Sequence, residues 1–362
     1  MTNYKLMTSK FVSYFILIFC TLITILPLFW MAYSSFKSNE EITRDIYAFP
    51  KELFWNSDDK YVIIKDSISL VRPYNIKKDT RERLIIESTT ISPGKKVMVY
   101  YLIKDKLPEK ISRLNIGDTF HLRELPLSMR IRVSWQTAWF NYRAAFEKGG
   151  LGFKFLNSIL YTVVSTFLIV VLGLMIAFGL TKFNYKKISL FIMGFIGLGY
   201  LISQQSVIIP LFLMMSSLNL TDTHIGIILV YTAFGLPLAV LLMTQFMKGL
   251  PNSLIESAEI DGSNMINIFI KIISPMCIPV VVTVIIFSAL GIWNEFLLVL
   301  VLASSEATKS LPVGVYSFTS IVASQLGWQM AALVIATFPT IIAYLIFQKQ
   351  LNQNVVGGAI KG

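Results

Sequence analysis

Ionisable side chains are scarce in this sequence, and cysteine and histidine are nearly absent from it. Asp, Glu, Lys and Arg make up 15% of the 362 residues, 54% are hydrophobic, and the mean hydropathy is +0.64. This composition excludes an ordinary soluble enzyme domain. The two cysteines, Cys20 and Cys277, are too few for a disulfide framework, so we expect both to be packing residues. The two histidines give no metal-ligand cluster, so we expect no metal site.

The scarcity of charge is uneven, and long stretches carry none at all. A helix that crosses about 30 Å of hydrocarbon needs about 20 residues nearly free of ionised groups. The uncharged stretches predict transmembrane helices near 11–35, 156–180, 189–212, 225–247, 277–301 and 328–347. The first is longer than the apolar core of a signal peptide and has no small-residue cleavage site after it. We therefore expect it to remain as an anchor.

The positions of Lys and Arg predict the orientation, because short cytoplasmic loops are enriched in both. With the N-terminus inside, the cytoplasmic segments carry Lys5, Lys10, Lys182, Lys186, Lys187, Lys248, Lys271, Lys349 and Lys361, whereas the short outer loops carry only Lys309. Six crossings return the C-terminus to the cytoplasm. The net charge of +11 is therefore partly a topology signal and does not indicate nucleic-acid binding.

Most charges lie in one block, residues 37–150, which holds 21 of the 32 Lys and Arg and 15 of the 21 Asp and Glu. Short β-branched or aromatic runs between turn signals predict a small antiparallel β domain at about 56–134. The expected strands are Tyr61–Lys65, Ser67–Val71, Arg83–Glu87, Lys96–Leu102, Thr119–Arg123 and Met129–Val133. Lying between the first two spans, the domain is expected outside the cytoplasm. It is either a docking surface for a solute-binding protein or another subunit, or a structural cap.

The loop between the fourth and fifth spans has its own pattern. Ser253 and Glu256 fit a capping box, so we expect a helix from about Leu254, interrupted at Gly262. A second helical face follows at Met265, Ile268, Phe269 and Ile272, and we expect Pro275 to end this helix at the membrane. The spacing by itself predicts an interfacial helix pair, which either docks on a partner or lies on the membrane surface.

The same segment resembles the EAA loop of binding-protein-dependent ABC importers, whose pattern is Glu-Ala-Ala, three residues, Gly, nine residues, Ile, one residue, Leu-Pro. The matching positions are Glu256, Ser257, Ala258, Gly262, Ile272 and Pro275. Two positions depart from the pattern, because Ser257 and Ser274 stand where Ala and Leu are usual. Both changes keep the order of helix, glycine and helix.

Further motifs resemble the MalG-type permeases of carbohydrate importers. They are Asp261-Gly262, Trp293-Asn294-Glu295, Leu311–Gly314, Gly358–Gly362, Asn141-Tyr142 and Asn157-Ser158. The resemblance covers residues 1–50 and 135–362, and the stretch between them departs from it. The alternatives are an EAA-type permease for another solute, such as a peptide or an anion, and a membrane-anchored sensor with the β domain as its receptor. The Trp-Asn-Glu triplet and the C-terminal motif favour carbohydrate.

The resemblance implies a mainly α permease of six transmembrane helices in a bacterial cytoplasmic membrane. Its parts would be an anchor at 1–36, an extracytoplasmic region at 37–150, a permease core at 151–347 with the EAA loop at about 248–275, and a cytoplasmic tail at 348–362. Partners would be a MalF-like permease, two cytoplasmic ATPase subunits, a solute-binding protein and membrane lipid. The chain lacks a P-loop sequence. We therefore expect no catalysis in it, with ATP and Mg held by the ATPases.

The resemblance also assigns roles to residues. ATPase coupling falls to Glu256, Ser257, Ala258, Asp261, Gly262, Ile272 and Pro275, and a place at the ATPase interface to Gly358, Ala359, Lys361 and Gly362. For the solute path, polar and aromatic side chains within spans are candidates, because they are costly in lipid unless they face protein or water. These are Tyr200, Gln205, Tyr231, Phe234, Asn294 and Glu295, with helix packing as the alternative. Pro210 and Pro237 are expected to kink their spans.

Overall fold

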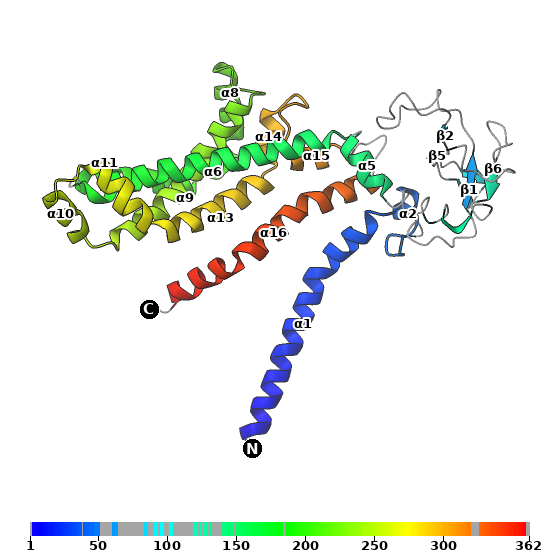
Figure 1. Ribbon diagram of the computed structural model, residues 1–362, viewed down its shortest axis with the longest axis horizontal. Coiled ribbons are helices and arrows are strands. Elements are labelled where there is room, and N and C mark those ends of the chain that lie inside the picture. The colour runs from blue at the N-terminus through cyan, green and yellow to red at the C-terminus, as the bar shows by residue number, and fades with distance from the viewer. Residues whose placement is uncertain are drawn as a thin grey trace. The chain divides into compact units, whose positions relative to one another are not determined.

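The chain is mainly helical in a computed structural model (Figure 1). The structure describes residues 2–50 except 38, and 139–359 except 148, 184–185 and 320–325; between 51 and 138 it describes six strands and residues 124, 126–128 and 131. The chain divides into two compact units. One contains residues 1–149 and 317–335, and the other contains residues 150–316 and 336–362.

The first unit begins with helix α1 (Thr2–Ser34), drawn in blue in Figure 1. Its side chains from Phe11 to Phe29 are exposed. An apolar helix of this length needs a lipid or protein surface around it. Cys20 lies on this exposed surface, so its predicted role in packing stays a prediction.

The turn after α1 is held by helix α5 (Phe140–Glu147) and by the start of helix α16 (Leu326–Ala359). The Asn141 side-chain amide donates to the Ser35 and Lys37 carbonyls at 2.7 Å each. Asn39, the first residue of helix α2 (Asn39–Arg44), accepts through its side chain from the Gly327 amide at 2.9 Å. A Cβ atom at Gly327 would lie 2.8 Å from the Lys37 carbonyl oxygen, so only glycine fits there.

The strands of this unit are short. They are β1 (Lys60–Ile63), β2 (Arg83–Ile85), β3 (Thr90–Ser92), β4 (Lys95–Val97), β5 (Tyr101–Ile103) and β6 (Thr119–His121). They form one sheet in the order β3-β4-β1-β6 and a β2-β5 pair. The β1–β4 pairing is parallel, where the sequence predicts antiparallel pairs only. The run 96–102, predicted as one strand, contributes to both β4 and β5. The predicted strands Ser67–Val71 and Met129–Val133 lie outside the described residues, apart from Ile131, which is helical.

The second unit packs around helix α6 (Leu151–Lys182), with helix α9 (His224–Lys248) and helix α13 (Ile278–Asn294) against it. Buried side chains from these helices form the core, among them Ile169, Met243, Met247 and Val284. Cys277 is fully buried in the same core, as predicted for a packing residue. The remaining elements are helices α7 (Lys186–Leu201), α8 (Ile208–Ser217), α14 (Leu297–Leu302) and α15 (Leu311–Tyr316), the 3₁₀ turn η4 (Gln204–Val207), and the loop described below.

Among the described residues, four helices are long and apolar enough to cross a membrane, at Phe11–Ser34, Leu151–Lys182, His224–Lys248 and Leu326–Gln348. Two further apolar helix pairs are bent, Lys186–Leu201 with Gln204–Ser217 by 89° and Met265–Met276 with Ile278–Asn294 by 72°. The number of crossings reaches six if each pair is one span. The third span bends at Ile202–Ser203, ahead of Pro210, and Pro237 lies inside α9. The kinks predicted at these two prolines stay predictions.

Candidate functional site

The loop after α9 folds as a helix, a glycine turn and a second helical segment. Helix α10 (Ser253–Ile260) is followed by Gly262 with φ +79°, then by α11 (Met265–Ile268), a π-helical turn η5 (Phe269–Ile273) and α12 (Ser274–Met276). We call residues 253–276 the loop helices. The predicted interruption at Gly262 is confirmed. Its left-handed conformation is one that L side chains rarely adopt.

Two local details differ from the sequence prediction. Helix α10 has Asn252 as its N-cap residue with no side-chain cap, so the expected capping box of Ser253 and Glu256 does not form. The second helix is capped instead, because the Asn264 side chain accepts from the Asn267 amide at 2.8 Å. Pro275 lies within α12 and does not end the helix; the bend follows at Cys277. Proline is tolerated there because the first turn of a helix leaves its amides unpaired.

The loop helices bury one face and expose the other. Ile255, Ala258, Ile268 and Ile273 are buried in the α6–α9–α13 core, and Met265, Phe269 and Ile272 pack against them. The predicted apolar face is therefore confirmed. On the opposite side Glu256, Ser257, Asp261, Gly262 and Pro275 are exposed. Three large apolar side chains are exposed as well, Ile260 at 86%, Ile266 at 68% and Ile270 at 58%. This surface is suited to covering by another molecule.

A single lysine holds the entrance to the loop helices. Lys182, the last residue of α6, donates from Nζ to the Leu250 carbonyl at 3.1 Å and to the Asn252 side-chain oxygen at 3.0 Å. The start of α10 is thus fastened to α6 as well as to α9. The sequence analysis used Lys182 only as a mark of orientation, since no local pattern links it to residues 68 or 70 positions later.

A second group of candidates meets where α13 ends. Glu295 interrupts the apolar stretch with an extended backbone, and one of its carboxylate oxygens accepts from the Leu298 amide at 2.8 Å, at the start of α14. The other accepts from the Tyr231 hydroxyl of α9 at 3.0 Å. The predicted fifth span is therefore broken at Glu295. A carboxylate within an apolar bundle needs such donors, because an unpaired charge is costly there.

The other path candidates are dispersed. Phe234 packs against the same buried cluster as Tyr231. Asn294 is exposed, and its amide donates to the Leu290 carbonyl at 2.8 Å. Tyr200 and Gln205 lie on α7 and η4 with exposed side chains. The structure brings together only Tyr231, Phe234 and Glu295. Gly358 and Ala359 end α16, and Lys361 and Gly362 lie outside the described residues.

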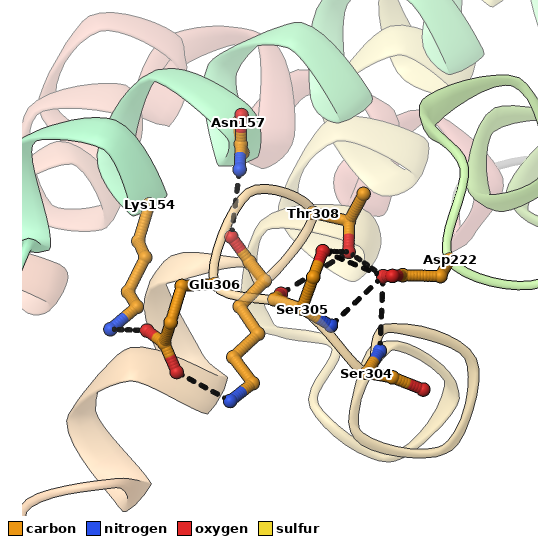
Figure 2. A network of polar contacts seen from close by, with 8 residues as sticks. Lys154, Asn157, Asp222, Ser304, Ser305, Glu306 and Thr308 are labelled. Atoms are coloured by element: carbon orange, nitrogen blue, oxygen red, sulfur yellow. Dashed lines mark hydrogen bonds and ion pairs between the residues drawn. The ribbon is translucent and has the colours of Figure 1, made fainter.

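A polar network that the sequence did not reveal lies at the other end of α6 from the loop helices (Figures 1 and 2). Asp222 has φ +56° and accepts through Oδ1 from the amides of Ser304 and Ser305, at 3.1 and 3.0 Å, and from the hydroxyls of Ser305 and Thr308. Four donors on one oxygen fix residues 303–310 against the loop before α9. These donors hold the pKa of the Asp222 carboxyl below its usual value.

Helix α6 holds the same segment from its other side. Lys154 is 3% exposed and pairs with Glu306 at 2.7 Å, and Glu306 also pairs with Lys309 at 2.6 Å (Figure 2). The Asn157 amide donates to the Ala307 and Lys309 carbonyls at 2.7 and 3.0 Å. The two lysines lower the pKa of the Glu306 carboxyl. In the sequence, Lys154 and Asn157 near the start of this apolar helix were the local indication that it contacts a polar segment.

Removing the Asp222 carboxylate is expected to release residues 303–310. In Asp222→Ala the Ser304 and Ser305 amides lose their acceptor, and we expect a loss of about 2 kcal/mol in the free energy of local unfolding. Hydrogen exchange at these two amides measures it. Asp222→Asn keeps one acceptor oxygen and should lose less. Equal protection in Asp222→Ala and the parent would show that the network does not hold the segment.

The same carboxylates predict a pH dependence. A folded-state pKa below the unfolded one contributes stability above the unfolded pKa, and this contribution is lost as pH falls through the folded pKa. Both Asp222 and Glu306 have lowered pKa values. Protection of the Ser304 and Ser305 amides should therefore be constant near neutral pH and fall at acid pH, below the usual carboxyl range. In Asp222→Ala the acid-dependent part should shrink.

Comparison with known proteins agrees with this geometry. The sequence profile of the binding-protein-dependent transport system inner membrane component matches residues 144–357. The chain is 32% identical over 222 residues to the sulfoquinovosyl glycerol transport system permease protein SmoH of Agrobacterium fabrum, covering 61% of this chain and 78% of SmoH. It is 33% identical over 226 residues to the trehalose transport system permease protein SugB of Mycobacterium tuberculosis, covering 61% and 81%.

A third relative is the diacetylchitobiose uptake system permease protein NgcG of Streptomyces coelicolor, 31% identical over 225 residues, covering 61% of this chain and 74% of NgcG. Among solved structures, a bacterial ABC transporter involved in the import of the acidic polysaccharide alginate superposes with a TM-score of 0.57 at 18% identity, covering 93% of this chain and 94% of that one. This likeness shows the fold of an ABC importer permease. The chain belongs to the family of inner membrane components of binding-protein-dependent transport systems.

Proposed function

We propose that this chain is a transmembrane subunit of an ATP-driven, binding-protein-dependent importer of a sugar or oligosaccharide. The observation that carries the proposal is the geometry of the loop helices, within a chain of this permease family. One face is buried in the core and the other presents Glu256, Asp261 and exposed isoleucines beside a glycine turn. Such a surface fits a partner that moves and takes the helices with it.

The partner in this proposal is an ATPase, which holds ATP and Mg. The loop helices lie on the cytoplasmic side, with both termini on that side and six crossings. The third crossing is the bent pair of α7 with η4 and α8, and the fifth is α13. Docking would involve Glu256, Ser257, Ala258, Asp261, Gly262, Ile272 and Pro275, although Ala258 is buried and Ile272 half-buried. Ala258 and Ile272 would pack behind the exposed docking residues and hold them in place. The tail residues Gly358, Ala359, Lys361 and Gly362 would reach the ATPase interface. The chain itself would carry out no catalysis.

Carbohydrate is the proposed cargo because SmoH, SugB and NgcG are named for the transport or uptake of saccharides or a sugar-bearing glycerol. Tyr231, Phe234, Asn294 and Glu295 are the proposed path residues, with Tyr200 and Gln205 at exposed positions. A second permease would complete the path, and a solute-binding protein would deliver the sugar. The region 37–150 would lie outside the cytoplasm, with its β-rich part at about 56–134 as a docking surface or cap.

The test is purification of the chain in mild detergent followed by ATPase assays of the reconstituted complex. A nucleotide-binding subunit should co-purify, and its ATPase activity should rise when the cognate binding protein and one member of an oligosaccharide panel are added. Absence of a nucleotide-binding subunit would favour the membrane-anchored sensor. Stimulation by a peptide or an anion instead of a saccharide would show that the permease serves another solute.

A further inference from the structure

A charged cleft lies beside the loop helices, and Glu256 is the one of its lining residues that the transport proposal also uses. Its volume is about 790 Å³. Its walls come from the end of α6, the start of α7, the end of α9, and α10 with Met265. The charged residues that line it are Lys182, Lys186, Lys248, Glu256 and Glu259. It therefore combines three positive charges with two negative ones.

Most of these charges have no partner within the described part of the chain. Lys182 donates to the Leu250 carbonyl and to Asn252, whereas Lys186, Lys248, Glu256 and Glu259 form no ion pair among the described residues. Lysine and glutamate side chains that share a cleft without pairing can each bind a ligand group of opposite charge. They therefore suit a ligand that carries both a positive and a negative charge.

A buried hydroxyl in the cleft wall is a second observation that indicates a ligand. Thr244 lines the cleft and is 1% exposed, and its hydroxyl oxygen has no hydrogen-bond partner among the described residues. A buried hydroxyl without a partner costs free energy unless a ligand or water satisfies it. Ser189 of α7 contributes a second hydroxyl to the wall. The site thus offers ammonium and hydroxyl donors together with carboxylate acceptors.

Apolar side chains of α7 form part of the cleft wall. Leu190 and Met193 line it from α7, a helix that has no buried residue along its length. Leu190 is 77% exposed, and Leu201, about three turns further along the same side of α7, is 78% exposed. A ligand with a polar head in the cleft and apolar chains along α7 would cover both surfaces. A soluble phosphate compound would leave the apolar surface bare.

We propose that the cleft binds the headgroup of an aminophospholipid, as in phosphatidylethanolamine. Its phosphodiester would lie against Lys186 and Lys248 and its ammonium group against Glu256 and Glu259. Two carboxylates disfavour a purely anionic headgroup such as phosphatidylglycerol, and the need for a hydrogen-bond donor disfavours phosphatidylcholine, whose nitrogen is fully methylated. The inference rests on the proposed function only in treating α7 as a membrane-crossing helix.

The test is native mass spectrometry of the full chain in detergent, titrated with each of three lipids that carry identical acyl chains. Phosphatidylethanolamine should bind about tenfold more tightly than phosphatidylcholine, the loss expected when charge-assisted hydrogen bonds are removed. Equal binding of these two lipids, or tighter binding of phosphatidylglycerol, would overturn the proposal. Binding of soluble glycerophosphoethanolamine as tight as that of the lipid would also overturn it, because the apolar surface of α7 would then contribute nothing.

Matched lysine variants localise the site. Lys186→Gln with Lys248→Gln should remove most of the preference for phosphatidylethanolamine, whereas Lys187→Gln should retain it, because Lys187 is exposed but does not line the cleft. An undiminished preference in the double variant would place the lipid elsewhere and refute the assignment. If the double variant does not fold, the comparison of lipids on the parent chain still decides the proposal. Lipid binding is measured without uptake or ATPase activity. Failure of this proposal can therefore be distinguished from failure of the proposed function.

Discussion

Gly262→Val is expected to abolish uptake while the chain still inserts in the membrane. The backbone at Gly262 has φ +79°, and a left-handed conformation costs an L residue about 1–2 kcal/mol, with β-branched residues the least tolerant. A Cβ atom would meet nothing within 4 Å in the described part of the chain. The cost therefore falls on the turn between α10 and α11, not on the core. Uptake by cells that express equal amounts of each protein measures the effect.

Gly262→Asn separates two explanations of that loss. Asparagine tolerates the left-handed region better than other non-glycine residues, so the turn should survive and uptake should fall less than in Gly262→Val. If both variants are inactive and both chains insert normally, the requirement is close approach of the partner to the glycine. Wild-type uptake in Gly262→Val would refute the proposed role of the turn.

Glu295→Ala is the second substitution with a large expected effect. It removes the acceptor of both the Tyr231 hydroxyl and the Leu298 amide, which are left unpaired in an apolar surrounding. Loss of such a network costs about 2–4 kcal/mol, which corresponds to a population change of more than tenfold. We expect a lower melting temperature in detergent and uptake reduced by at least about tenfold.

Two further variants apportion this loss. Glu295→Gln keeps an acceptor oxygen for the Leu298 amide, so the start of α14 should be retained and stability should fall less. Tyr231→Phe removes one donor and leaves the Leu298 contact intact. If Glu295→Gln melts like the parent but does not transport, Glu295 contributes to the solute path as well as to the fold. Unchanged stability in Glu295→Ala would show that the network is dispensable.

The absence of charge was enough to locate the long helices. The predicted spans 156–180 and 225–247 correspond to α6 at Leu151–Lys182 and α9 at His224–Lys248, because a helix in lipid requires an uncharged stretch wherever it occurs. The division of residues 253–276 was also predictable, since Gly262 marks a conformation that few other residues adopt. Both are local properties of the sequence.

The helix breaks and the polar networks could not be predicted in this way. The break at Glu295 depends on Tyr231, 64 residues earlier, and the Asp222 network depends on residues 82 to 86 positions later. Hydrogen bonds between distant segments leave no periodicity in the sequence. The helix also continues past Pro275, because the first turn of a helix can accommodate a missing amide.

Helix α6 carries a fastening at each end. Lys154 and Asn157 hold the segment 303–310 near its start, and Lys182 holds the entrance to α10 at its last residue. A straight helix of 32 residues is about 48 Å long, so a tilt of about 5° would displace one end by about 4 Å relative to the other. The helix can therefore act as a lever: a push on one fastening becomes a displacement at the other without any change in the helix itself.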